Sequence, residues 1–452
     1  MAQTSRTQLP VGVIIPSVVC DADPKQTYAL YLPSNISNEH TWPIIYVFDP
    51  AARGPLAVET ISAAAEKFGY IVAASNNSHN GPLGAPSEAA QAMWRDTHAK
   101  LPIDVHRRYT AGMSGGARVA TGIALACKDC VAGVIVNAAT FPGQPAPPPD
   151  MKFAYFAAYG NADFNFPEFF QLRKKFDDVH AHYKMRMFVG EHGWAPPQVW
   201  LEALNWMDLQ AMASGTLPRD EKRIQQSLNE TMARAQQMRI DGDVLESVRE
   251  YQSIARDFAM LADVAEARNQ LTALLKDKTY KNAERVEANT VSEQAQLTTE
   301  ISEKIGQIAS GGLDTAKMTG LRNQMSQLKK KADAAPAGTK DPKMLVALRS
   351  RQQLVAEAYE GGQTSTDLKK YDDALQYFEV SAAAARHPEY SQFQRARAYA
   401  LKGDKKGTIA TLKQAIESGF TDATVLAGED FNGVRAMPEF QALVTQLKEK
   451  KQ

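Results

Sequence analysis

A serine inside a glycine-rich pentapeptide is the residue of this sequence that is best placed to do chemistry. Residues 112–116 read Gly-Met-Ser-Gly-Gly, with Ser114 at the centre. A nucleophile on a sharp turn between a strand and a helix needs small neighbours, and Gly112 and Gly116 remove the Cβ atoms that would collide there. A serine that merely caps a helix is the alternative. The pattern predicts that Ser114 is a nucleophile.

The hydroxyl group of a serine is nearly inert at neutral pH, so Ser114 needs a general base and an acid that orients the base. Two later segments supply such groups after expected strands, Gly160-Asn-Ala-Asp163 and Gly190-Glu-His192. In the chain order Ser, Asp, His, Asp163 would orient His192. The imidazole of His192 would then take the proton of Ser114.

Five other residues compete for the roles of base and acid: His180, His182, Asp177, Asp178 and Glu191. The first four lie on a helix that we expect over residues 167–182, where a solvated polar face explains them more simply. Glu191 is a poor acid for this purpose because it adjoins the histidine and points away from it.

The oxyanion of an acyl-transfer reaction needs backbone donors. Gly115 would supply one N–H group, and the loop over residues 48–54 would supply the other, from Ala52 or Arg53. Arg53 would alternatively contact an anionic substrate group or lie on the rim without a function. Trp194 either lines an acyl or aromatic pocket or simply packs.

Short apolar runs that alternate with helical stretches must position these residues, and they predict an α/β domain over residues 1–218. The expected strands cover residues 11–19, 28–32, 43–48, 70–74, 109–111, 131–136, 153–159 and 184–189. The expected helices cover residues 58–67, 87–100, 117–126, 167–182 and 199–213. Runs that are continuously apolar, such as Ile44 to Phe48, are typical of strands buried on both faces.

The sequence pattern after residue 218 predicts helices only. We expect one helical region over residues 219–335 and a second over residues 343–452. Tyr371-Asp-Asp-Ala-Leu is followed 34 positions later by Lys405-Lys-Gly-Thr-Ile, and 34 is the period of tetratricopeptide repeats. Between the two regions, residues 332–342 read as a loop.

Composition sets outer limits on the function. Lys plus Arg and Asp plus Glu number 51 each, so nothing indicates binding to nucleic acid or to a membrane surface. The polar start Met-Ala-Gln-Thr favours an exported, periplasmic or secreted protein, with a cytoplasmic location as the alternative. For Cys127 and Cys130, packed thiols are favoured over a disulfide. No residues suggest a metal site.

With these motifs in order over residues 112–194, the chain resembles compact bacterial esterases, in particular polyhydroxybutyrate depolymerases and feruloyl or acetyl-xylan esterases. The resemblance implies an α/β-hydrolase fold without metal or organic cofactor. It assigns nucleophile, acid and base to Ser114, Asp163 and His192. Residues 345–447 resemble tetratricopeptide-type repeats.

The expected function is therefore cleavage of carboxylic esters through an acyl-enzyme, with small-molecule or polymer esters of feruloyl, acetyl or polyester type as substrates. An interaction scaffold with a weakly active hydrolase half, or a serine peptidase, are the alternatives. The helical half would bind a protein partner or form a homo-oligomer.

Overall fold

The computed structural model describes residues 9–81, 85–127, 129–143 and 147–449. The polar start at residues 1–4, on which the expected export depends, lies outside the described residues. Contacts within the chain divide it into two compact units, Met1–Glu287 and Ala288–Gln452.

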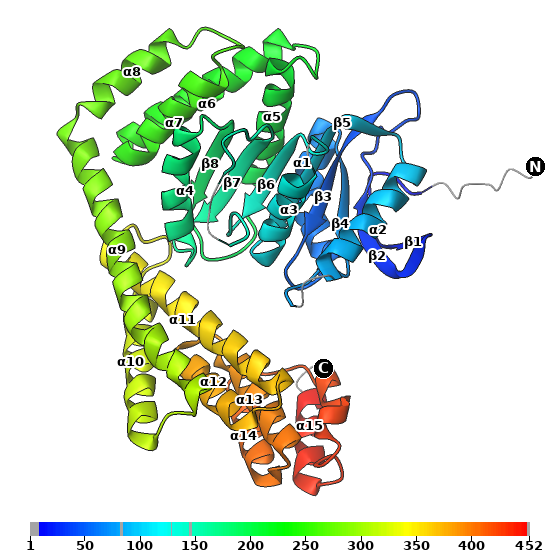
Figure 1. Cartoon of the computed structure of the whole chain (residues 1–452), viewed down its shortest axis with the longest axis vertical. Coiled ribbons are helices and arrows are strands. Elements are labelled where there is room, and N and C mark those ends of the chain that lie inside the picture. The colour runs from blue at the N-terminus through cyan, green and yellow to red at the C-terminus, as the bar shows by residue number, and fades with distance from the viewer. Residues whose placement is uncertain (1–8, 82–84, 128, 144–146, 450–452) are drawn as a thin grey trace, which may run out of the picture. The chain divides into compact units, whose positions relative to one another are not determined.

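A mixed sheet of eight strands forms the centre of the first unit, as far as the described residues go (Figure 1). The strand order is β1-β2-β4-β3-β5-β6-β7-β8, with β1 and β2 antiparallel to their neighbours and all strands from β4 to β8 parallel. The strands are β1 (Ile14–Cys20), β2 (Asp23–Tyr31), β3 (Trp42–Phe48), β4 (Ile71–Ser75), β5 (Ile103–Met113), β6 (Gly133–Asn137), β7 (Ala154–Gly160) and β8 (Tyr183–Phe188). Each lies at one of the expected apolar runs.

Helices cover both faces of the sheet, which explains why β3 is buried along its whole length. They are α1 (Gly54–Phe68), α2 (Ala85–Lys100), α3 (Gly115–Ala126), α4 (Phe166–Asp178) and α5 (Pro197–Ala213). Helices α1 and α5 share a core with Ile45 and Val47 of β3, whereas α2 and α3 line the opposite face with Tyr46 and Phe48. The predicted α/β-hydrolase architecture is confirmed.

Three further helices belong to the first unit: α6 (Glu221–Ile240), α7 (Val244–Asp257) and α8 (Ala265–Leu275). Glu250 of α7 forms ion pairs with Lys184 of β8 and with Arg234 of α6, and Arg234 also contacts Glu202 of α5. These buried ion pairs attach α6 and α7 to the sheet. By its internal contacts the first unit runs to Glu287, and the catalytic domain over residues 1–218 stays a prediction.

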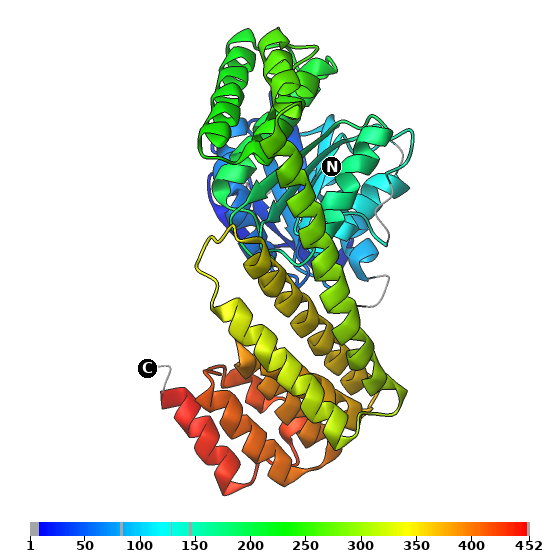
Figure 2. The ribbon, with the colours of Figure 1, turned by 90° about the vertical axis from the view of Figure 1, so that its left-hand side faces the viewer.

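The described part of the second unit is entirely helical, as predicted, and helix α9 (Lys278–Gly306) runs across the division between the units. The other helices are α10 (Thr315–Asp333), α11 (Pro342–Asp367), α12 (Tyr371–Ala384), α13 (Pro388–Lys402), α14 (Lys405–Glu417) and α15 (Pro438–Glu449). Successive helices from α11 to α14 pack against each other (Figure 2). Helices α12 and α14 begin 34 positions apart, and the likeness to tetratricopeptide repeats stays a prediction.

The loop that we expected between two helical regions joins α10 and α11 inside this single unit. Leu321 and Met325 of α10 share a hydrophobic core with Leu354 of α11. This core crosses the loop, and the division into helical regions over residues 219–335 and 343–452 stays a prediction.

The cysteines differ from the expectation. Cys127 and Cys130 form a disulfide, so the interpretation as two packed thiols is wrong. Cys20 is buried and unpaired, and burial raises the pKa of its thiol to about 11. Spacing alone fits both states, whereas the 5.7 Å between the two Cα atoms lies within the range that a disulfide spans.

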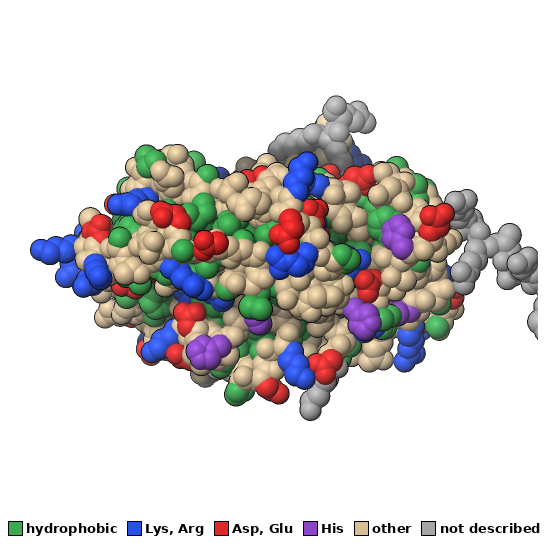
Figure 3. Space-filling model, turned by 90° about the horizontal axis from the view of Figure 1, so that it is seen from above, with side chains coloured by type: hydrophobic (Ala, Val, Ile, Leu, Met, Phe, Trp, Pro, Cys, Tyr) green, Lys and Arg blue, Asp and Glu red, His purple; other side chains and the backbone are tan. Residues whose placement is uncertain are grey.

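The surface of the molecule reflects the balanced composition. On the face shown in Figure 3, Lys and Arg side chains lie interspersed with Asp and Glu side chains. Among the helices within the described ranges, we find none that combines the length and the apolar character required for a membrane span.

Candidate active site

Ser114 lies on a strained turn between β5 and α3. Its φ of 52° and ψ of −121° fall in a region that side-chain-bearing residues rarely adopt. A Cβ atom on Gly112 would lie 2.2 Å from the carbonyl oxygen of Gly116, and one on Gly116 would lie 2.0 Å from that of Phe48. The two glycines are therefore required by the close approach of β3, β5 and α3 at the turn.

The three residues predicted as nucleophile, base and acid form one hydrogen-bonded chain. His192 Nε2 lies 2.9 Å from Ser114 Oγ, and His192 Nδ1 lies 2.9 Å from Asp163 Oδ1. The side chain of Asp163 is 0% exposed and that of His192 is 16% exposed. The residues follow β5, β7 and β8, whose carboxyl ends meet at one edge of the parallel sheet.

The loops after β7 and β8 are joined by backbone contacts that set Asp163 against His192. The N–H of Ala162 donates to the carbonyl of Gly190, at 2.9 Å, and a Cβ atom on Gly160 would lie 2.3 Å from the same oxygen. The N–H of Asn165 donates to Asp163 Oδ1 at 2.8 Å, which fixes the carboxylate.

Phe164 is a site residue that the sequence reasoning missed. Its ring stacks on the imidazole of His192, with 4.2 Å between the ring centroids and 29° between the planes. The signal was its position directly after Asp163. The ring limits the rotation of the imidazole, and so it supports the orientation that Asp163 imposes.

The competing histidines do not lie on a helix, which corrects that expectation. Helix α4 ends at Asp178, His180 lies in a turn with a φ of 51°, and His182 precedes β8. The chain turns back here because β8 must pair with β7. The structure brings neither histidine into hydrogen-bonding contact with Ser114.

The loop after β3 is organised around the buried carboxylate of Asp49. Asp49 Oδ1 accepts hydrogen bonds from the N–H groups of Ala51 (2.8 Å) and Arg53 (3.3 Å), and the guanidinium of Arg53 holds both carboxylate oxygens at 2.9 Å. The N–H of Ala52, whose φ is 57°, donates to the carbonyl of Asp49 at 3.2 Å. Both amides that we predicted as oxyanion donors are thus directed at Asp49.

Trp194 completes the cluster around Asp49. Its Nε1 donates to Asp49 Oδ2 at 3.0 Å, and its ring lies near that of Trp200 in the core. Burial raises the pKa of Asp49, but hydrogen bonds from Arg53, Ala51 and Trp194 outweigh it and lower the pKa below its ordinary value. The ionised Asp49 connects the loop after β3 to the segment that follows His192.

Gly115 occupies the first position of α3, where backbone N–H groups have no acceptor inside the helix. The carboxamide of Asn80 covers it so closely that a Cβ atom on Gly115 would lie 1.8 Å from Asn80 Oδ1. The N–H of Asn80 donates to the carbonyl of Pro50 at 2.8 Å. The site therefore contains a polar side chain from the loop after β4, next to the predicted donor.

Within the ranges that the structure describes, no cluster of three or more His, Cys, Asp and Glu side chains could hold a metal ion. The groups assembled here are a hydroxyl, an imidazole, a carboxylate and amide donors. This set supports proton transfer and nucleophilic attack.

No protein-family model and no curated protein sequence matches the chain. Solved structures similar to it include a ferulic acid esterase, at 14% identity over 43% of this chain and 96% of that one, with a TM-score of 0.36. Another is the fluorophosphonate-binding serine hydrolase F of Staphylococcus aureus, at 14% identity over 44% of this chain and 99% of that one, with a TM-score of 0.36. A third is an esterase of Mycobacterium marinum, at 15% identity over 43% of this chain and 81% of that one, also with a TM-score of 0.36. At these scores, the similarity assigns no activity to this chain.

Proposed function

We propose that this protein is a serine hydrolase that cleaves carboxylic esters through an acyl-enzyme. The observation that carries the proposal is the hydrogen-bonded chain from Ser114 Oγ through His192 to the buried Asp163, with 2.9 Å at each step. Its support is geometric, since a nucleophile, a base and an orienting acid already lie within hydrogen-bonding distance.

In the first half of the reaction, Ser114 Oγ attacks the ester carbonyl carbon while its proton passes to His192 Nε2. The carboxylate of Asp163 stabilises the imidazolium by accepting the hydrogen bond from Nδ1. The imidazolium then protonates the departing alcohol, which leaves an ester between the acyl group and Ser114. In the second half, water takes the place of the serine hydroxyl, and the same proton transfers release the acid.

The oxyanion that forms in each half needs donors at the start of α3. We assign the N–H of Gly115 as the first, aided by the positive end of the helix dipole. We assign the carboxamide of Asn80 as the second donor, through its Nδ2, because this carboxamide lies directly against Gly115. Its Oδ1 is the atom nearer to a Cβ built on Gly115, at 1.8 Å against 3.2 Å for Nδ2, so the carboxamide must turn over to donate. The amides of Ala52 and Arg53 would first have to release Asp49.

A panel of p-nitrophenyl esters, including acetate, tests the proposal with wild-type protein, Ser114→Ala and Ser62→Ala. Ser62 is a suitable control because it lies on α1 and bonds only its own helix, through the carbonyl of Glu59. We expect turnover by wild type and Ser62→Ala, an initial burst of p-nitrophenol, and a loss of more than about a thousandfold in Ser114→Ala. Turnover by Ser114→Ala near the wild-type rate would refute the assignment.

Feruloyl and acetyl esters, and aliphatic and aromatic polyesters, are the natural substrate classes to compare in the same assay. Release of amines from peptide substrates at rates above those for esters would favour a serine peptidase instead.

The triad residues all come from the first unit. For the second unit we propose a protein partner or self-association, which light scattering on the full chain tests.

A further inference from the structure

A cavity of about 930 Å³ lies between α2 and α3, on the face of the sheet that carries Tyr46 and Thr110. At one end it is lined by Gly115 and Asn80, beside Ser114, and at the other end by the Cys127–Cys130 disulfide. Its size lies within the range of pockets that hold small organic ligands. The cavity is therefore long, and it begins at the proposed reaction centre.

The walls of the cavity are largely apolar. Helix α3 contributes Val119, Ile123 and Ala126, and α2 contributes Ala90 and Trp94, at spacings that put each set on one face of its helix. Apolar walls of this kind accommodate an aliphatic or aromatic chain better than a sugar.

The charged side chains that line the cavity are all positive. Among its described lining residues are Arg95, Arg108 and Arg118, and none is an Asp or a Glu. Arg118 is already neutralised, because it pairs with Glu168 at 2.5 Å and donates to the carbonyl of Phe141. Positive charge without a counter-ion thus remains at the half-buried Arg108 and at the exposed Arg95.

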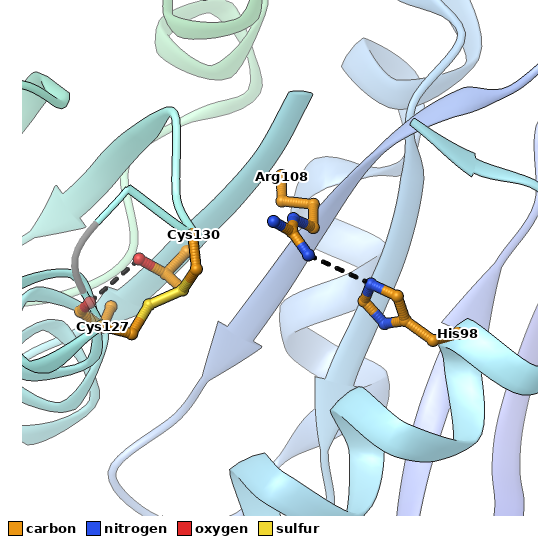
Figure 4. The surroundings of a disulfide bond; sticks show 6 residues. His98, Arg108, Cys127 and Cys130 are labelled. Carbon is orange, nitrogen blue, oxygen red and sulfur yellow. Dashed lines mark hydrogen bonds between the residues drawn. A yellow bond between two sulfur atoms is a disulfide. The ribbon is translucent and has the colours of Figure 1, made fainter. Parts of the chain in front are cut away.

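Arg108 is held in place but not neutralised. Its guanidinium lies over the ring of Trp94, 4.9 Å from the centroid, and Nη1 meets His98 Nε2 at 3.4 Å. Figure 4 shows Arg108 between His98 and the Cys127–Cys130 disulfide. Its Nε is buried and has no hydrogen-bond partner, and Arg108 forms no ion pair with any acid of the described residues.

His98 does not compensate the charge of Arg108. Burial lowers the pKa of His98, its hydrogen bond to the Trp94 carbonyl raises it, and Arg108 lowers it again, with a net decrease that favours the neutral imidazole. The adjacent Arg107, by contrast, has a counter-ion, since it pairs with Asp104 at 2.8 Å. A partly buried charge without a counter-ion carries a desolvation cost that a ligand of opposite charge would offset.

We propose that the cavity binds the chain of an elongated ester and that Arg108 binds a carboxylate at the far end of that chain. The inference rests on the proposed esterase function. Arg108 and Ser114 are six residues apart along β5 and its turn, which corresponds to about 20 Å. The substrate class is therefore a long apolar acyl chain that ends in a carboxylate, as in a monoester of a long α,ω-dicarboxylic acid.

The test compares two p-nitrophenyl esters of equal chain length, the monoester of hexadecanedioic acid and the palmitate, by their ratio of kcat/KM. We expect wild type to prefer the carboxylate-terminated ester roughly 10- to 100-fold, as a charged hydrogen-bonded pair supplies. Arg108→Gln should bring the ratio close to one, and Arg108→Lys should restore part of it. Arg107→Gln is the matched control, because Arg107 points to the opposite face of the sheet, and it should keep the preference.

A wild-type ratio near one, or an unchanged ratio in Arg108→Gln, would overturn the inference and leave the esterase proposal standing. Hydrolysis of p-nitrophenyl acetate by wild type reports on that proposal separately. Binding of hexadecanedioic acid to Ser114→Ala, followed by tryptophan fluorescence, needs no turnover. The inference requires that adding Arg108→Gln weakens this binding roughly 10- to 100-fold and that adding Arg107→Gln does not.

Discussion

Replacing Asp49 with Asn tests whether this buried carboxylate organises the active site. All the groups around it are donors: the N–H groups of Ala51 and Arg53, the guanidinium of Arg53 and Nε1 of Trp194. An asparagine keeps the shape of the side chain, but one of its two terminal atoms is an NH₂ group. In either orientation of the amide, this NH₂ group faces the donors of Oδ1 (Ala51 and Arg53) or those of Oδ2 (Arg53 and Trp194). At least one buried donor then loses its acceptor.

The size of the effect follows from the exposure of each partner. A buried donor without an acceptor costs about 1–3 kcal/mol. The side chain of Arg53 is 47% exposed, so the loss of its ion pair adds at most about 1 kcal/mol. We expect Asp49→Asn to lower the free energy of unfolding by about 2–4 kcal/mol. The loop after β3 should also shift relative to His192, which should reduce kcat for p-nitrophenyl acetate roughly 10- to 100-fold.

Urea unfolding followed by tryptophan fluorescence measures the stability, and Trp194→Phe completes a double-mutant cycle. With phenylalanine at this position the indole donor is gone, so the double variant should lose less stability than the two single variants together, by about 1 kcal/mol or more. Asp49→Asn with wild-type stability and activity, or strictly additive effects in the cycle, would refute the reasoning.

Three further predictions concern the acid, the oxyanion donor and the response to pH. Asp163→Asn should lower kcat by about 10⁴-fold with an unchanged circular dichroism spectrum, because His192 loses its orienting carboxylate; near-wild-type kcat would exclude Asp163 as the acid. Asn80→Ala should lower kcat about 10²- to 10³-fold with little change in KM, and a change in KM alone would contradict a donor role. Burial raises the pKa of Glu250, but Lys184 and Arg234 outweigh it and lower the pKa from 4.5 to about 2. Its stabilising effect is present above pH 4.5 and is lost as the pH falls towards 2, so Tm should fall over this interval in wild type and less in Glu250→Gln. Parallel Tm profiles would contradict that assignment.

The strands of the sheet and the positions of the proposed triad could be predicted because both depend on local patterns. Strands buried on both faces need continuous apolar runs, and the carboxyl ends of neighbouring parallel strands meet at one edge. Ser114, Asp163 and His192 lie one, three and four residues after the ends of β5, β7 and β8. Their proximity thus follows from chain order and strand direction.

The floor of the cavity could not be predicted in this way. We predicted a strand over residues 109–111, or from Arg108 at the earliest, whereas β5 extends from Ile103 to Met113 and includes Arg107 and Arg108. Consecutive residues of a strand point to opposite faces, so one arginine pairs with Asp104 and the other enters the cavity. Charged residues inside a buried strand do not appear in a hydrophobic pattern.

Tertiary packing also decided where the amides of the loop after β3 point and which helices belong to the first unit. The amides of Ala52 and Arg53 are directed at Asp49 because a buried carboxylate needs donors, and one of these comes from Trp194, far along the chain. Helices α6 and α7 join the first unit because Glu250 forms ion pairs with Lys184 of β8 and Arg234 of α6.

By itself, the sequence determined which chemistry we propose and which residues we assign to it, since strand ends and glycine sterics are properties of short segments. The tertiary structure alone decided that the amides of Ala52 and Arg53 are directed at Asp49, how far the first unit extends and where Arg108 lies. These features depend on hydrogen bonds, ion pairs and burial between residues distant in the chain, and no local pattern records them.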